Sequence, residues 1–172
     1  MAKEEFLKKH GIVRSAVRKD LLYFFIPWIL VLFTGVGICG WDLVRSQESL
    51  YESSTQNMVG LMLIVIGFVI VMVAQITLWK YYSSTLVIKE NHRLITHGIY
   101  RFVRHPIYLG NIILFLGIAV YVSSLYGFLT LLGLIPVFLV RIRMEERLLT
   151  EEFGDKHRIY KKNTRKLFPF II

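Results

Sequence analysis

The chain has 172 residues, of which 55% are hydrophobic and 19% charged, and its formal net charge at pH 7 is +9. This composition is typical of a membrane protein and excludes collagen-like, disulfide-rich and disordered chains, since the sequence holds only 12 Gly, 4 Pro and one Cys. The single cysteine, Cys39, also excludes an intrachain disulfide.

Two uncharged stretches in the first half of the chain are long enough to cross a membrane as helices. Leu21 to Trp41 is a run of 21 residues without a charge, and Met58 to Trp79 is a run of 22. A hydrocarbon core about 30 Å thick requires about 20 helical residues. We therefore predict a transmembrane helix in each stretch.

The second half of the chain contains a third uncharged stretch, which is longer. Ile107 to Val140 spans 34 residues, too many for one crossing, and it is interrupted by polar and small residues at 123–127. We predict a helical hairpin with its turn there. The following residues, from Arg141 to about Lys162, favour a helix that continues beyond the membrane and ends before Pro169.

Basic residues alternate between the polar segments. Lys and Arg number 6, 1, 5, 0 and 9 in segments 1–20, 42–57, 80–105, 123–127 and 141–172. Under the positive-inside rule, both termini and the 80–105 loop face the cytoplasm, and the basic surplus requires no nucleic acid partner. The sequence thus predicts an all-α polytopic membrane bundle of about four transmembrane helices, with a cytoplasmic C-terminal helical extension. We expect residues 1–172 to form a single membrane-embedded domain.

Two polar segments carry further expectations. The N-terminal segment places apolar residues, including Ile12, Val13 and Val17, among Lys and Arg, which favours an amphipathic helix on the membrane surface. Apolar runs at 85–88 and 93–96 flank a polar 89–92 segment, which favours a small β-hairpin.

Two patterns are discounted as ligand sites. The segment 35–40 matches G-x-G-x-x-G, but it ends a predicted transmembrane helix and does not lie between a strand and a helix. Its small residues are expected to serve helix packing. His92, His97 and His105 fall close together but lack the spacing of a known metal-binding motif, so no metal site is predicted.

The segment 98–110 leads into the hairpin and has the features of an anion site. Pro106 suits the first position of a helix, and the free amides of the first turn would converge there with Arg104 and His105. The alternative is that the basic residues are interfacial anchors and that Tyr100 and Tyr108 belong to an aromatic belt.

Charged residues also follow the end of the hairpin. Arg141 and Glu145 are four residues apart, on one helix face, and Glu146 is adjacent. They form either a solvated ion pair or one wall of a polar pocket near Arg104 and His105. The pocket is feasible because the two arms of a hairpin are neighbours.

These residues occur in a longer pattern that resembles a known family. The pattern comprises His92 to Tyr100, Arg104 to Tyr108, Glu145-Glu146, Phe153-Gly154, Tyr160 and Pro169. It resembles the isoprenylcysteine carboxyl methyltransferase family, which shares its C-terminal pattern with membrane phospholipid methyltransferases. The resemblance covers roughly residues 79–169, which would form the cofactor-binding and catalytic region. His157 and Lys166 depart from the family's usual tyrosine and arginine.

The resemblance implies an integral-membrane enzyme of the protein-S-isoprenylcysteine O-methyltransferase type. It would transfer a methyl group from S-adenosylmethionine to a lipophilic acceptor, such as the carboxylate of a prenylated cysteine, with membrane lipids as partners. Arg141 matches the family's substrate-contacting arginine and is the expected catalytic residue. The implied cofactor-binding residues are His92, Arg93, Leu94, Ile95, Tyr100, His105, Pro106, Ile107, Tyr108 and Glu145.

The residue types suit these roles. Tyr100 and Tyr108 can stack on adenine, the helix start at His105 favours a carboxylate, and Glu145 can pair with a cation. Three alternatives remain at this stage. They are a phospholipid or amine N-methyltransferase, a sterol-type reductase using NADPH, and a membrane scaffold without enzyme activity.

Overall fold

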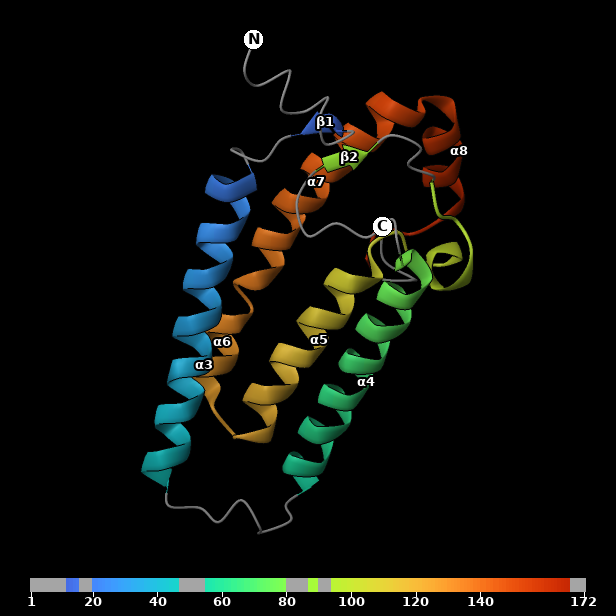
Figure 1. Cartoon of the computed structure of the whole chain (residues 1–172). Coiled ribbons are helices and arrows are strands. Elements are labelled where there is room, and N and C mark those ends of the chain that lie inside the picture. Colours follow the sequence, from blue (N-terminus) through green and yellow to red (C-terminus); the bar gives the residue numbers. More distant parts are fainter. Residues whose placement is uncertain (1–11, 16–19, 47–54, 80–86, 90–93, 168–172) are drawn as a thin grey trace.

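The computed structural model describes residues 12–15, 20–46, 55–79, 87–89 and 94–167, and its long helices run side by side as a bundle (Figure 1). This confirms the prediction of an all-α membrane bundle, to which a short strand pair is added. The described elements are β1 (Ile12–Ser15), η1 (Leu21–Phe25), α3 (Ile26–Ser46), α4 (Thr55–Leu78), β2 (Val87–Lys89), η3 (Gly98–Arg101), α5 (Pro106–Tyr121), α6 (Leu125–Leu131), α7 (Leu134–Phe153) and α8 (Asp155–Asn163).

Among the described residues, three helical stretches are long and apolar enough to cross a membrane. Their bounds are Leu21–Arg45, Thr55–Leu78 and Leu125–Phe153, and α5 is a shorter apolar helix of 16 residues. The two expected spans in the first half and the helical hairpin in the second half are therefore present. Large apolar side chains such as Phe33 and Phe68 point outward, with 73% and 53% of their surface exposed, as expected for helices that contact lipid.

The first span begins with a local change of helix type. The π-helical segment η1 runs directly into α3, whose second residue is Pro27. Proline has no N–H to donate to the preceding turn, and a π turn is one of the adjustments by which a membrane helix accommodates it. This segment carries Phe24 and the adjoining Asp20, both of which are buried and face α7.

Small residues allow α4 and α5 to lie close together along their whole length. A Cβ added at Gly67 would come within 2.6 Å of the carbonyl oxygen of Gly110, and one at Gly60 within 2.4 Å of the backbone nitrogen of Tyr121. On α5, a Cβ at Gly117 would meet the backbone nitrogen of Ile64 at 2.8 Å. Such backbone contact is the usual way in which membrane helices associate, and it fixes the position of α5.

The G-x-G-x-x-G segment lies in the middle of α3 and not at the end of a helix as predicted, because α3 continues to Ser46. A Cβ at Gly35 would meet the Leu131 side chain of α6 at 2.7 Å, whereas nothing lies within 4 Å of one at Gly37 or Gly40. Only the first glycine of the pattern therefore serves close helix packing.

The hairpin turn is tighter than predicted. Helix α5 ends at Tyr121 and α6 begins at Leu125, with Ser124 as its N-cap accepting a hydrogen bond from the amide of Gly127 at 3.0 Å. The helical extension ends at Asn163, close to the predicted limit, but Gly154, with φ of +52°, divides it into α7 and α8.

The described parts of the two polar segments do not form the amphipathic helix and the β-hairpin that the sequence predicted. Residues 12–15 form strand β1 rather than a helix, and β1 pairs antiparallel with β2, with Ile12 opposite Lys89. Of the expected hairpin, 87–89 is a strand, but 94–96 has no regular structure. The β-branched residues of β1 favour an extended backbone, and it pairs with β2 because both segments lie at the same end of the bundle (Figure 1).

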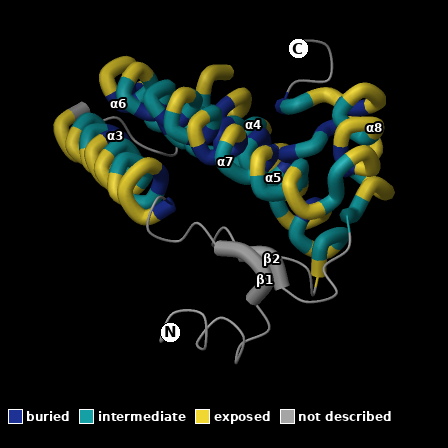
Figure 2. The backbone as a smooth tube through the Cα atoms, turned by 90° about the horizontal axis from the view of Figure 1, so that it is seen from above, coloured by how far each residue is buried: buried dark blue, intermediate teal, exposed yellow. Residues whose placement is uncertain are grey.

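The same end of the bundle carries helix α8. Seen along the bundle, α3 and α8 lie on opposite sides, with α5 and α7 between them (Figure 2). Buried polar side chains at this end include His105, which precedes α5, Arg141 and Glu146 of α7, and His157 of α8. The apolar core extends between α3, α5, α6 and α7.

Candidate functional site

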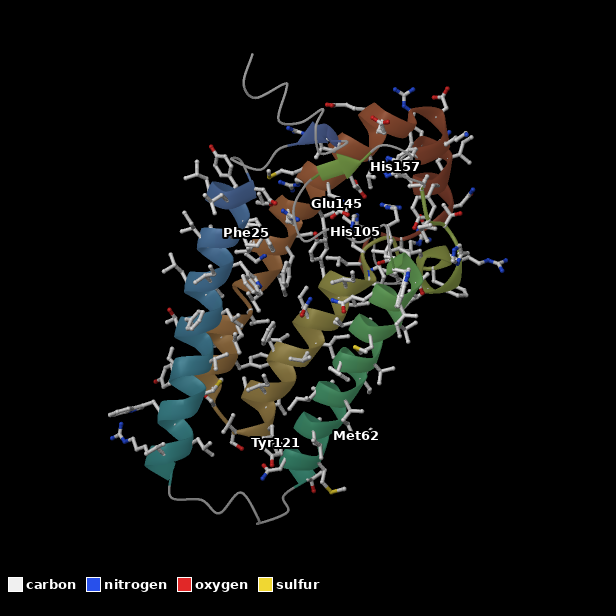
Figure 3. The ribbon with its side chains drawn as sticks, viewed as in Figure 1. Phe25, Met62, His105, Tyr121, Glu145 and His157 are labelled. Atoms are coloured by element: carbon white, nitrogen blue, oxygen red, sulfur yellow. The ribbon has the colours of Figure 1, made fainter. Side chains whose placement is uncertain are left out.

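The first turn of α5 and the middle of α7 meet through polar side chains. The hydroxyl of Tyr108 donates to Oε2 of Glu145 at 2.9 Å, and Nδ1 of His105 lies 3.8 Å from the same oxygen. Figure 3 shows His105 and Glu145 near each other, toward the end of the bundle that carries His157. The helix start and the hairpin end thus form one site, as the sequence indicated.

Arg141 joins this site from one helical turn before Glu145. Its Nε donates to the Tyr108 hydroxyl at 3.2 Å, so Tyr108 links the guanidinium to the carboxylate of Glu145. The guanidinium also forms an ion pair with Asp20 and lies 4.7 Å from the centroid of the Phe24 ring. Only 3% of the Arg141 side chain is exposed, so its charge is compensated inside the protein.

A second carboxylate, Glu146, lies on the other side of the His105 ring. Its Oε1 accepts from Nε of Arg104 at 3.0 Å and is 3.4 Å from Nε2 of His105, while its Oε2 is 3.2 Å from Nζ of Lys161. The His105 ring thus lies between two carboxylates, which fix its orientation, and only 4% of the residue is exposed.

Arg104 has a different role from the one the sequence suggested. Its guanidinium donates to Glu146 and to the backbone carbonyls of Lys161 and Thr164. Its amide donates to the carbonyl of Arg165 at 2.8 Å, and that of His105 donates to Lys166 at 3.2 Å. Arg104 therefore ties the C-terminal segment to the start of α5, and its guanidinium is already paired within the protein.

Helix α8 closes over this network through two ring side chains. His157 is 1% exposed, and its Nδ1 is 2.8 Å from Oγ1 of Thr150, which donates to the carbonyl of Glu146. Burial lowers the pKa of His157, and the charges of Lys161, Arg104 and His105 lower it further against the opposing effect of Glu146. The histidine that departs from the family pattern is thus buried and contacts α7 through Thr150.

Tyr160 holds the predicted stacking residue Tyr100. The Tyr160 hydroxyl donates to the carbonyl of Tyr100 at 2.7 Å, and Tyr100 is only 6% exposed. Burial raises the pKa of Tyr160 to about 12, although Arg104 opposes the shift. Tyr100 therefore lies beneath α8.

The remaining predicted cofactor residues are placed less centrally. Leu94 and Ile95 are half-buried and precede η3, Pro106 is buried as the first residue of α5, and Ile107 is half-buried in the first turn. His92 and Arg93 lie outside the described residues.

Sequence reasoning missed Asp20. Asp20 is the last charge before the first span, as Arg141 is the first charge after the hairpin. Two opposite charges at the edges of spans that end on the same predicted side are candidates for an ion pair, and this signal was available.

Comparison with known proteins identifies the family. Residues 55–156 match the family model for phospholipid methyltransferases, and the chain belongs to this family. It is 34% identical over 116 residues to a probable protein-S-isoprenylcysteine O-methyltransferase from Oryza sativa subsp. indica; the match covers 66% of this chain and 61% of the relative. The resemblance stated from the sequence is thereby confirmed.

Two further comparisons extend this result. Over 79 residues the chain is 39% identical to methanethiol S-methyltransferase 1 of Bradyrhizobium diazoefficiens, with 45% of this chain and 27% of the relative covered. The structure of a eukaryotic intramembrane Ras methyltransferase, isoprenylcysteine carboxyl methyltransferase, matches with a TM-score of 0.67 and 22% identity, covering 92% of this chain and 55% of that one. The shared fold and the apolar helices identify an integral membrane protein. The match to the rice relative covers about three-fifths of that relative's length.

Proposed function

We propose that the protein is a membrane methyltransferase that transfers a methyl group from S-adenosylmethionine to the carboxylate of a prenylated cysteine or a similar lipid. The observation that carries the proposal is the connected series His105, Glu145, Tyr108 and Arg141. It places groups suited to the cofactor beside a guanidinium suited to a carboxylate. The similarity to the rice relative, a probable protein-S-isoprenylcysteine O-methyltransferase, supports the same assignment.

The residues at the start of α5 fit S-adenosylmethionine. Glu145 keeps 33% of its side chain exposed, so its carboxylate can accept from ribose hydroxyls or pair with the ammonium group. The first-turn amides of α5 favour the cofactor's carboxylate, and the half-buried Tyr108 ring offers a flat surface. When bound, the cofactor supplies an electrophilic methyl group on its sulfonium. Residues His92 to Ile95, Tyr100, Pro106 and Ile107 complete the proposed cofactor site.

Arg141 is the proposed orienting residue for the acceptor. A guanidinium can hold a carboxylate at two points and so aim one oxygen at the methyl group. Methyl transfer by in-line displacement needs little proton chemistry when the acceptor is already ionised. The protein therefore contributes mainly alignment and the exclusion of water, for which the buried surroundings of Arg141 are suited.

The activity is tested by incubating the purified protein with methyl-labelled S-adenosylmethionine and either a lipid extract or S-farnesylated N-acetylcysteine. We expect a labelled product that releases methanol in base, because a methyl ester is base-labile. A product that keeps its label in base would be a methylated amine or thioether and would contradict the carboxylate assignment.

The cofactor site is tested separately by calorimetric titration with S-adenosylhomocysteine. His105→Ala and Glu145→Ala should each weaken binding, because each removes a polar partner at the helix start. The matched controls are His97→Ala and Glu151→Ala, which alter exposed residues of the same types. Wild-type affinity in both site variants would show that the cofactor site is elsewhere.

A thiol or amine acceptor is the second candidate, favoured by three observations. One relative is a methanethiol S-methyltransferase, and the matching family model describes phospholipid methyltransferases. In addition, Arg141 already has a carboxylate partner in Asp20, which reduces its attraction for an anionic acceptor. Parallel assays with methanethiol and with phosphatidylethanolamine would identify these activities.

We also propose that the site and both termini face the cytoplasm. The alternation of Lys and Arg counts supports this orientation, and β1, β2 and α8 all lie at one end of the bundle (Figure 1). In a Cys39→Ser background, a membrane-impermeant thiol reagent added to intact cells should label a cysteine introduced at Ser49 but not one at Lys89 or Lys161. Labelling at Lys89 would reverse the orientation.

A further inference from the structure

Asp20 is the only described carboxylate that the first span contributes to the site, and it lies outside the segment 55–156 that matches the family model. Its side chain is fully buried and forms an ion pair with Arg141, which is 3% exposed. A buried guanidinium without a counterion is strongly destabilising. Asp20 is therefore the internal anion that makes the burial of Arg141 possible.

The other parts of the Arg141 guanidinium have partners of a different kind. Its Nε donates to the Tyr108 hydroxyl at 3.2 Å, and the ring of Phe24 lies 4.7 Å from its central carbon. Asp20 lies on the Nη1 side. An acceptor carboxylate held by this guanidinium would pair with the positive charge that Asp20 now compensates.

We propose that Asp20 is a specificity-determining residue that competes with the acceptor's carboxylate for Arg141, so that acceptor binding exchanges an internal anion for an external one. This inference rests on the proposed function. The residue at the start of the first span would then select the acceptor. An uncharged acceptor that displaced Asp20 would leave Arg141 without an anion in its place. Carboxylate acceptors bind by exchange, whereas their methyl-ester products leave Asp20 to return to Arg141.

The proposed exchange predicts that removing the charge of Asp20 improves acceptor binding. In Asp20→Asn the buried Arg141 loses its ion pair and keeps Glu145, which it meets through the Tyr108 hydroxyl, so an anionic acceptor gains an attraction that it lacks in the wild type. The KM for S-farnesylated N-acetylcysteine should fall by roughly fivefold or more, in keeping with the strength of charge-assisted hydrogen bonds. A residue that merely oriented Arg141 would instead raise KM or lower kcat when changed.

The experiment compares wild type with Asp20→Asn, Asp20→Glu and Asp42→Asn in detergent. Asp42 is a matched control, since this α3 carboxylate accepts a hydrogen bond from Ser124 Oγ at 2.5 Å, away from Arg141. KM is measured for the farnesylated acid, and thermal unfolding is followed with the acid or its methyl ester. We expect the acid, and not the ester, to stabilise Asp20→Asn more than it stabilises wild type, with Asp20→Glu and Asp42→Asn resembling wild type.

An unchanged or raised KM in folded Asp20→Asn, or equal stabilisation by acid and ester, would overturn the inference. If Asp20→Asn fails to fold, extraction in the presence of the acid should recover folded protein where the ester does not, and failure of both would also overturn it. The thermal measurement needs no turnover. A wild type that methylates only thiols or amines therefore refutes the proposed function independently of the result for Asp20.

Discussion

The α4–α5 interface and the contact between η1 and α7 belong to the same bundle but are built from opposite chemistry. Between α4 and α5, glycines remove side-chain volume so that the two backbones touch. Between η1 and α7, the fully buried charges of Asp20 and Arg141 meet beside aromatic rings. The first interface is held close by glycines, and the second places an ion pair in the protein interior.

The α4–α5 interface therefore serves the structure of the bundle, whereas the contact between η1 and α7 belongs to the proposed acceptor site. Backbone packing through small residues has one close arrangement and fixes where α5 begins. A buried ion pair is costly to form, and removing one of its partners is strongly destabilising. The protein thus holds its proposed cofactor end on the glycine-packed helix and its proposed acceptor end on the ion-paired one, with Tyr108 and Glu145 joining the two.

The largest expected effect is at the ion-paired contact. Arg141→Ala should lower turnover of a carboxylate acceptor by about a hundredfold, since misalignment of a reacting group has that cost. Affinity for S-adenosylhomocysteine should change far less. Arg141→Lys should restore little activity, because an ammonium lacks the planar two-point fork. Kinetics and titration on the same preparations test this, and normal turnover in both variants would remove Arg141 from the mechanism.

The glycine-packed interface can be broken by a single methyl group. Gly67→Ala places a Cβ within 2.6 Å of a backbone oxygen on α5 and should reduce the free energy of unfolding by about 2 kcal/mol. Gly37→Ala is the matched control, since nothing lies within 4 Å of its Cβ. Denaturation in detergent micelles should show the loss for Gly67→Ala alone. Equal stability of both variants would contradict the close packing described here.

The link between the two regions is expected to have a smaller effect. Tyr108→Phe removes the hydroxyl that joins Arg141 to Glu145 but keeps the ring, whose centroid is 5.2 Å from that of Phe138. We expect roughly a fivefold fall in turnover, corresponding to the loss of about 1 kcal/mol from one hydrogen bond. The fall should appear with little change in unfolding temperature. A fully active Tyr108→Phe would show that the two regions act independently.

The smallest effect concerns pH and helix α8. Burial lowers the pKa of His157 in the folded protein, so the unfolded chain binds a proton at this position more readily. This contribution to stability is complete above the unfolded pKa of about 6.5 and is lost as the pH falls toward the folded value.

The stability of the wild type should therefore fall between pH 7 and pH 6. His157→Gln should flatten this part of the stability profile, and His97→Gln, at an exposed position, should not. Parallel profiles for wild type and His157→Gln, measured by chemical denaturation at each pH, would exclude the contribution.

The amino-acid sequence by itself determined the spans, the hairpin and the polar segments, because each depends on local runs of apolar residues and on their length relative to a bilayer. It also brought His105, Tyr108, Glu145 and Arg141 to one site, since the two arms of a hairpin must be neighbours. Family membership followed from a spaced pattern within one part of the chain and was confirmed by comparison.

The tertiary structure alone decided which charges met. Asp20 could pair with Arg141, and Glu146 with Arg104 and Lys161, only once separate helices were packed at the same depth. Strand β2 likewise pairs with β1 instead of forming a hairpin. Periodicity and hydropathy are local properties, whereas an ion pair or a strand pair depends on the distance between elements that are remote in sequence, and that distance is set by the packing of the whole bundle.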